Sequence, residues 1–130
     1  MSSRDAPLRL LYVEDNRLSA ILFEEALRLR PGFELRLAVD ADDAMDQLQG
    51  WQPDLLVLDA QLPGIDGIEL LQRLRGQAHL RQVPAFMCSA DALPGDVQRA
   101  HDAGFAGFWP KPIDIGQILR DLQGVAAARG

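Results

Sequence analysis

The sequence has little of several residue types, and each shortage excludes a class of structure. The single cysteine, Cys88, excludes an intrachain disulfide and a cysteine-based zinc site. Such sparse cysteine is typical of a reducing compartment, so we expect a cytoplasmic protein. The longest apolar run near the start, 10–13, ends at Glu14 and is far too short for a signal peptide or a membrane-spanning helix. No membrane association is therefore expected.

Positive charge is also scarce: 13 Lys and Arg stand against 19 Asp and Glu, for a net charge of -6. A field of this sign repels nucleic-acid phosphates and anionic lipid headgroups, so direct nucleic-acid binding is not expected. With 130 residues, 48% hydrophobic and 25% charged, the chain is predicted to form one packed domain. We find no repeat or internal linker, and expect a polar leader at 1–7, the domain at 8–125 and a C-terminal tail at 126–130.

Apolar residues alternate between short continuous runs and helical spacing along the chain. The short runs, which favour buried strands, lie at 9–13, 35–39, 55–58, 85–88 and 105–109. Helical spacing follows each run, and the first helix is predicted from Leu18, Ile21, Leu22, Ala26 and Leu29. Asp15 or Asn16 would cap it. Repeated β-α alternation requires parallel strands with right-handed crossovers, so the predicted fold class is α/β: a single doubly wound (βα)5 domain with a five-stranded parallel sheet.

Polar side chains follow four of the five expected strands. Glu14 and Asp15 come after the first strand, Asp59 after the third, Ser89 after the fourth and Lys111 after the fifth. Ligands of doubly wound sheets bind outside the carboxyl ends of the strands, so these side chains should meet in one pocket. Three carboxylates together need a cation, and oxygen ligands without His or Cys suit Mg²⁺ or Mn²⁺. A hydroxyl and an ammonium suit phosphoryl oxygens, so the predicted chemistry is phosphoryl transfer to a carboxylate.

Each of these residues also has a plainer interpretation when it is taken singly. Glu14 and Asp15 would serve as caps of the first helix, and Asp59 as a loop cap. Ser89 would serve as a helix cap and Lys111 as a solvated residue at a turn. Their joint placement at the ends of four strands is hard to attribute to capping, and it favours a functional site.

Four motifs resemble the receiver domain of two-component response regulators, of the chemotaxis-regulator type. They are Tyr12-Val13-Glu14-Asp15-Asn16, Leu58-Asp59-x-x-Leu62-Pro63-Gly64-x-Asp66-Gly67, Ser89-Ala90 and Lys111-Pro112. The spacing also matches, since Asp59 lies 44 residues after Asp15, 30 before Ser89 and 52 before Lys111. The resemblance covers nearly the whole chain and implies the flavodoxin-like strand order 2-1-3-4-5.

The resemblance implies that Asp59 accepts a phosphoryl group from a histidine of a sensor histidine kinase or a phosphotransfer protein. The metal ligands that it implies are Glu14, Asp15, Asp59 and the carbonyl of Gln61. Ser89 and Lys111 would then hold the phosphoryl group. Such a domain is a signalling switch rather than an ordinary enzyme, although it catalyses its own phosphorylation and dephosphorylation.

The resemblance also implies how the chemistry reaches the surface. Ser89 moves toward the phosphoryl group and Phe108 swings inward, which changes the face made by the fourth helix, fifth strand and fifth helix toward an output protein. Gln61 and Asp91 occupy positions that tune the lifetime of the phosphoryl group. Phe108 stands where Tyr is common, so packing alone would carry the switch, and Trp109 stands where an aliphatic residue is usual. We expect Trp109 to be packed rather than to anchor an interface, although it would also suit the centre of the output face.

Other residues and other functions are weaker candidates. His79 and His101 have no partner at ligand spacing and are expected at the surface, whereas Cys88 is expected to be packed. One alternative is a degenerate receiver that binds proteins without phosphorylation, which the intact acidic residues disfavour. Another is a phosphatase or mutase of an aspartate-nucleophile class, which usually has a second Asp where this chain has Gln61. The chain would be a free-standing regulator or the receiver of a hybrid histidine kinase. Residues 13–16 resemble the opening motif of receivers of that second kind.

Overall fold

Strands and helices alternate throughout the computed structural model, which describes residues 6–28 and 30–129. The elements are β1 (Leu8–Val13), α1 (Arg17–Arg28), β2 (Phe33–Ala38), α2 (Ala41–Gln47), β3 (Leu55–Asp59), β4 (Gln61–Leu62), β5 (Ile65–Asp66), α3 (Gly67–Arg75), the 3-10 turn η2 (Ala78–Leu80), β6 (Ala85–Ser89), α4 (Pro94–Asp102), β7 (Gly107–Pro110) and α5 (Ile115–Arg129). Among the described residues, no helix is long and apolar enough to cross a membrane.

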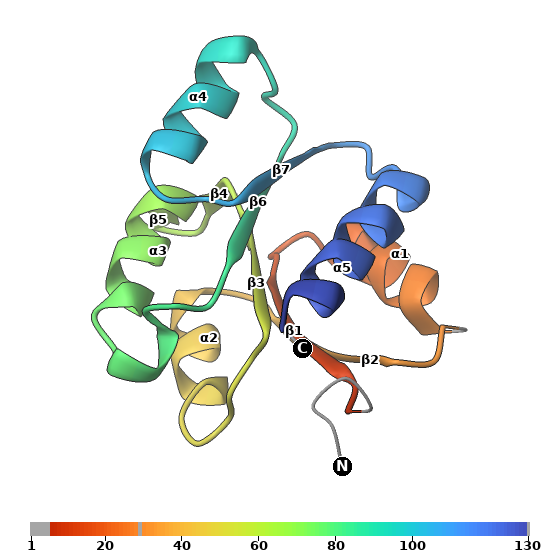
Figure 1. Cartoon of the computed structure of the whole chain (residues 1–130). Coiled ribbons are helices and arrows are strands. Elements are labelled where there is room, and N and C mark those ends of the chain that lie inside the picture. The colour runs from red at the N-terminus through yellow and green to blue at the C-terminus, as the bar shows by residue number, and fades with distance from the viewer. Residues whose placement is uncertain (1–5, 29, 130) are drawn as a thin grey trace.

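The five long strands form one parallel sheet in the order β2-β1-β3-β6-β7. Helices α2, α3 and α4 cover one face, and α1 and α5 cover the other (Figure 1). The short antiparallel hairpin β4-β5 lies outside this sheet. The order is the predicted 2-1-3-4-5 order once the hairpin is set aside, so the predicted α/β doubly wound fold is confirmed. Its carboxyl-terminal edge is the one at which the polar side chains are predicted to meet.

The central strand β3 explains why the sheet is covered on both faces. All five of its residues are buried, and alternate side chains enter different clusters. Leu55 and Val57 pack in the cluster that contains residues of α1 and α5, whereas Leu56 and Leu58 pack in the cluster of α2, α3 and α4. A strand that is apolar on both sides of the pleat needs a helical layer on each side.

Helix α1 exposes three of the five residues whose spacing predicts it. Leu18, Ile21 and Leu22 are 67%, 41% and 55% exposed, whereas Phe23 and Leu27 are buried. Both stripes of this helix are apolar, and shape decides between them, because the ring of Phe23 lies 4.6 Å from the ring of Tyr12 in the sheet. Leu29 lies outside the described residues.

Several element boundaries and some short elements differ from the sequence-based expectation. The last strand begins at Gly107 rather than Phe105, because the Phe105 amide donates to the Ala100 carbonyl and so belongs to the turn that ends α4. Helix α5 continues to Arg129, through the segment 126–129 that the sequence pattern assigns to a tail. The hairpin β4-β5 and the turn η2 have no counterpart in the predicted elements. Residues 1–5 of the expected leader and Gly130 lie outside the described residues.

Gly107 is predicted to be intolerant of even one added methyl group. A Cβ at this position would lie 2.8 Å from the ring of Phe86, which is buried against Trp109. Gly107→Ala should therefore lower the free energy of unfolding by about 1–3 kcal/mol. Gly124→Ala is the matched control: nothing lies within 4 Å of its Cβ, so the helix should gain about 0.5–1 kcal/mol. Urea denaturation of both variants tests the pair, and a Gly107→Ala protein as stable as the wild type would contradict the packing.

Candidate functional site

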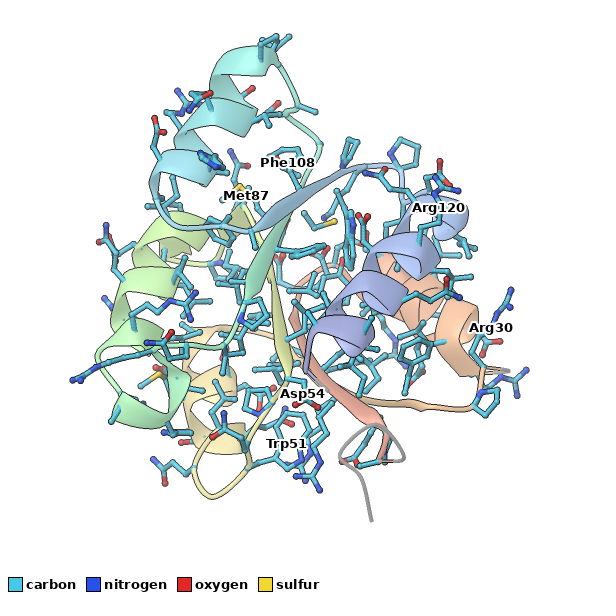
Figure 2. The ribbon with its side chains drawn as sticks, viewed as in Figure 1. Arg30, Trp51, Asp54, Met87, Phe108 and Arg120 are labelled. Carbon is cyan, nitrogen blue, oxygen red and sulfur yellow. The ribbon has the colours of Figure 1, made fainter. Side chains whose placement is uncertain are left out.

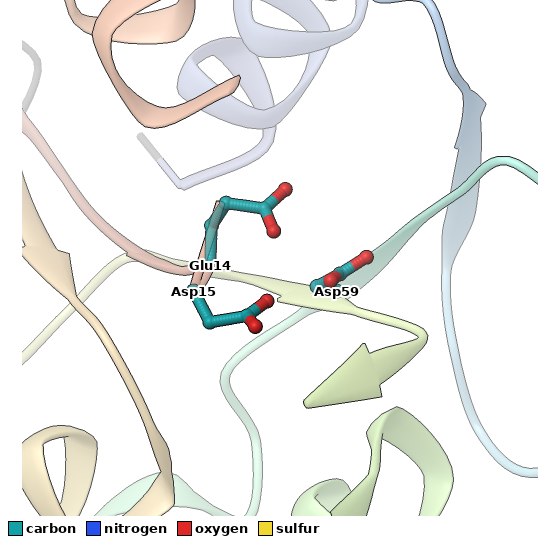
Figure 3. Close-up of side chains that lie close together, drawn as sticks. All are labelled: Glu14, Asp15 and Asp59. Atoms are coloured by element: carbon teal, nitrogen blue, oxygen red, sulfur yellow. The ribbon is translucent and has the colours of Figure 1, made fainter. Parts of the chain in front are cut away.

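Three carboxylates meet at the carboxyl-terminal edge of the sheet. Glu14 and Asp15 directly follow β1, and Asp59 is the last residue of β3, the neighbouring strand. Oxygen atoms of the three groups lie within 4.8 Å of one another, and Figure 3 shows them grouped between the strand ends. Glu14 and Asp59 are buried, at 2% and 7% exposure, whereas Asp15 is exposed. The topology thus assembles the cluster that the strand ends predict.

Lys111 places a positive charge among these carboxylates. Its backbone amide donates to the Ser89 carbonyl, which fixes it beside the end of β6. Its Nζ donates to Glu14 Oε1 at 2.5 Å and lies 3.2 Å from Asp59 Oδ1. No other lysine occurs in the sequence. One ammonium group is therefore shared between the two buried carboxylates.

Lys111 lies closer to Glu14 than to Asp59, and the pKa values of Glu14, Asp59 and Lys111 reflect this arrangement. Burial and the neighbouring Glu14 raise the pKa of Asp59 to about 6, and the attraction of Lys111 offsets this only in part. Burial also opposes the charge of Glu14, but hydrogen bonds, chiefly from Lys111, hold its pKa below the usual range. Burial likewise opposes the charge of Lys111, yet its two carboxylate partners raise its pKa above the ordinary value. At neutral pH the site therefore holds more negative charge than one lysine neutralises.

The cluster opens into a cavity of about 480 Å³. Its lining includes every residue that the sequence assigns to metal binding, catalysis or rate tuning: Glu14, Asp15, Asp59, Gln61, Ser89, Asp91 and Lys111. His79 and His101 are exposed and do not line it. A second cavity, of about 700 Å³, lies among residues of α5 and the segments 52–54 and 82–84, away from the cluster.

The helix caps are made by other residues, which answers the plainer interpretation of the acidic pair. The Asn16 side chain accepts the Ser19 amide at 3.0 Å and so caps α1. Asp66 accepts the Glu69 amide at 2.8 Å and caps α3. Ser89 is buried, but its Oγ accepts the Asp91 amide at 3.0 Å, so its hydroxyl also stabilises a local turn.

The aromatic pair on β7 divides between the two faces of the sheet. Phe108 is half-buried and pairs with Met87 of β6, and Figure 2 shows the two side by side near α4. Trp109 is 1% exposed, and its Nε1 donates to Asp121 of α5 at 2.8 Å. The expectation that Trp109 is packed is correct, and its place at the centre of an exposed output face is wrong, because its ring packs against Phe23 and Phe86. Cys88 is buried as expected, which raises its pKa to about 11.

Tyr12 also contacts the site, although the sequence pattern marks it only as a strand residue. Its hydroxyl, in a fully buried side chain, donates to Glu14 Oε1 at 2.9 Å. Burial and the nearby acids raise its pKa far above the ordinary range, so the hydroxyl remains a donor. A signal was present, because residues two apart at the end of a strand point to the same side of the sheet.

The donor set fits a hard divalent cation. Three carboxylates supply oxygen ligands only, and the buried pair carries an excess of negative charge that one ammonium does not balance. Mg²⁺ binds through one or two carboxylates while it keeps several waters, and the exposed Asp15 together with the open cavity leaves room for them.

Comparison with known proteins agrees with this geometry. The family model of the response regulator receiver domain matches residues 10–123. The polar-differentiation response regulator DivK of Brucella anthropi is 29% identical over 117 residues, which cover 90% of this chain and 94% of DivK.

Solved structures give the same result. The receiver domain of a sensor histidine kinase from Pseudomonas aeruginosa, which has a magnesium ion coordinated in its active-site cleft, is 30% identical, with a TM-score of 0.82 over 94% of this chain and 99% of that one. The chemotaxis regulator CheY4 of Vibrio cholerae shares the fold, with a TM-score of 0.83 at 24% identity over 92% of this chain and 99% of CheY4. The chain belongs to the response regulator receiver domain family, a family of signalling domains that bind Mg²⁺ in their acidic site.

Proposed function

We propose that this chain is a phosphorylated switch in which Asp59 accepts a phosphoryl group from a phosphohistidine of a sensor kinase or phosphotransfer protein. The observation that carries the proposal is the pairing of Asp59 with the sole lysine inside an open cavity, beside two further carboxylates. The family match supports it, since receiver domains work with such kinases.

The transfer exchanges one bond to phosphorus for another. A carboxylate oxygen of Asp59 attacks phosphorus, the bond from phosphorus to the donor's imidazole nitrogen breaks, and its electron pair returns to the ring. Lys111 lies 3.2 Å from Asp59 Oδ1, so its ammonium can hold a phosphoryl oxygen bound to Asp59. The Ser89 hydroxyl lines the same cavity and can donate to another oxygen.

The proposed metal ligands are Glu14, Asp15, Asp59 and the carbonyl of Gln61. A bound Mg²⁺ supplies positive charge that offsets the carboxylates and the incoming phosphoryl group. Gln61 begins β4 and lines the cavity next to Asp59. Gly67 allows the backbone to pass close to Asp59, because a Cβ at this position would lie 2.7 Å from the Asp59 carbonyl oxygen. The Gly67 amide donates to the Ala60 carbonyl.

The proposed output face consists of α4, β7 and α5. Ser89 ends β6, next to β7, so a movement of its hydroxyl toward the phosphoryl group changes the space beside Phe108. Phe108 is half-buried and can fill that space. Leu93 directly before α4, Val97 on α4 and Ile115 at the start of α5 are exposed, so an output protein has apolar surface to contact there. Phosphorylation then shifts an equilibrium between two forms of this face.

Acetyl phosphate with Mg²⁺ is expected to add one phosphoryl group to the wild-type chain, and none to Asp59→Asn, because the amide is not a nucleophile. Intact mass spectrometry measures both. An equal gain of mass in the variant would place the acceptor elsewhere. No gain in the wild type with any donor, a phosphorylated kinase included, would favour the unphosphorylated adaptor.

Removal of the charge of Asp59 should stabilise the metal-free protein. The pKa of Asp59 in the folded state is raised to about 6, so folding favours the protonated form of this carboxyl group. The stabilisation from protonated Asp59 is complete below about pH 4 and is lost as the pH rises through about 6. In chelator at pH 7.5, Asp59→Asn should therefore exceed the wild type by on the order of 1–3 kcal/mol, and the difference should vanish near pH 4. Mg²⁺ should stabilise the wild type by binding its folded state.

Thermal and urea denaturation at the two pH values test this expectation. Asp91→Asn is the matched control, because it removes another carboxylate of the same cavity from a residue that is exposed. It should change the stability much less than Asp59→Asn does. If Asp59→Asn is less stable than the wild type in chelator at pH 7.5, the repulsion within the cluster is contradicted.

Beryllofluoride with Mg²⁺, which mimics an aspartyl phosphate, should shift backbone amide resonances across 95–120 as well as at the site. The reason is that Ser89 and Lys111 lie at the ends of the adjacent strands β6 and β7. NMR spectra with and without the mimic measure the response, and Asp59→Asn serves as the control. Shifts restricted to the ends of β1 and β3 would show that the output face lies elsewhere.

A further inference from the structure

The hydroxyl of Tyr12 lies beneath the acidic cluster and contacts its most buried carboxylate. Tyr12 is fully buried, and its hydroxyl donates to Glu14 Oε1 at 2.9 Å. It is the single tyrosine in the sequence. Cys88 Sγ also lies 3.9 Å from the hydroxyl and offers only a weak acceptor. The strong partner of this hydroxyl is therefore Glu14.

The carboxylate of Glu14 is held by donors from three separate residues. Oε1 accepts both the Tyr12 hydroxyl, at 2.9 Å, and the Lys111 ammonium, at 2.5 Å. Oε2 accepts the Asn16 amide at 3.2 Å. Lys111 has a second carboxylate partner, because its Nζ also lies 3.2 Å from Asp59 Oδ1. Lys111 is therefore the donor that can break its hydrogen bond to Glu14 and still keep a carboxylate partner.

The proposed function requires that bond to weaken. A phosphoryl group on Asp59 brings new negative charge next to Lys111, and the ammonium must turn toward it. Glu14 Oε1 would then lose a charged donor while it remains buried, and the loss of a donor from a buried carboxylate is destabilising even where a bound cation offsets part of its charge. The Tyr12 hydroxyl already occupies the second acceptor position of this oxygen and does not need to move.

We propose that Tyr12 is a positioning residue for phosphorylation: its hydroxyl holds Glu14 in place and keeps Oε1 hydrogen-bonded while Lys111 shifts to the phosphoryl group on Asp59. This inference rests on the proposed function. It goes beyond that function because Tyr12 lies outside the reacting groups and is assigned a role in the movement of Lys111.

The ring of Tyr12 is fixed well enough for that task. Its ring centroid lies 4.6 Å from that of Phe23 on α1, and both side chains are buried. Because the side chain is held by packing on a strand, its hydroxyl is oriented before the reaction begins.

Tyr12→Phe removes the hydroxyl and keeps the ring. With acetyl phosphate and saturating Mg²⁺, its rate of phosphorylation should fall roughly tenfold, as expected for the loss of one hydrogen bond to a buried charge. Its affinity for beryllofluoride should fall by a similar factor, since that complex also needs Lys111.

Trp109→Phe is the matched control. It removes an indole from the same aromatic cluster, together with the hydrogen bond to Asp121, and leaves the pair of Tyr12 and Glu14 intact. It should lower the stability and leave the phosphorylation rate within about twofold, because every donor to the Glu14 carboxylate remains in place. Equal losses of rate in the two variants would show that Tyr12 acts through packing alone and would overturn the inference.

A spectroscopic measurement separates positioning from stability. Because Tyr12 is the sole tyrosine, protein labelled with ¹³C at the tyrosine Cζ gives one ring resonance whose shift reports the bond to Glu14. Beryllofluoride with Mg²⁺ should shift this resonance in the wild type, as Oε1 loses the lysine, and should leave it unchanged in Asp59→Asn. An unchanged resonance in a wild type that binds beryllofluoride would overturn the inference.

The outcomes distinguish this inference from the function on which it rests. If the wild type takes up a phosphoryl group and Tyr12→Phe does so at the same rate, the proposed function stands and the role of Tyr12 is refuted. If the wild type takes up neither a phosphoryl group nor beryllofluoride, the proposed function fails and the role of Tyr12 fails with it.

Discussion

The arrangement of the site depends on one ammonium group among three carboxylates. Lys111 lies within hydrogen-bond reach of Glu14 and close to Asp59, at 2.5 Å and 3.2 Å. Both acids are buried, and two buried negative charges so close together would repel each other strongly without a cation. The lysine makes the cluster compatible with a folded protein. Because one ammonium does not neutralise three carboxylates, the cluster keeps negative charge that a bound cation can offset.

The fold supplies this interaction from residues that are 97 positions apart in the sequence. The parallel order β2-β1-β3-β6-β7 brings the carboxyl ends of β1, β3 and β7 to one edge, and the apolar residues of the strands bury the base of the cluster. A buried base lowers the local dielectric, which strengthens every charged contact above it. The same apolar packing that stabilises the sheet therefore controls the chemistry of its edge.

The fold and the acidic cluster could be predicted from the sequence because both depend on simple rules of position. Alternation of strands and helices gives the doubly wound sheet, and strand ends give the pocket. The inner face of α1 could not be predicted, because Leu18 and Phe23 lie on two apolar stripes and only the space beside Tyr12 selects between them. The contact between Tyr12 and Glu14 is missed for a related reason: an apolar strand suggests packing, although the two-residue spacing places both side chains on the same side of the sheet.

The central claim, that Lys111 is held as a cation by Glu14 and Asp59, is tested most directly by the titration of this lysine. Since no other lysine occurs in the sequence, protein labelled with ¹³C at the lysine Cε gives one resonance that follows its charge. In the metal-free protein the account predicts a titration midpoint above the ordinary lysine pKa of about 10.4, because its two carboxylate partners outweigh its burial. A midpoint at or below the ordinary value, in protein that remains folded, would contradict the account.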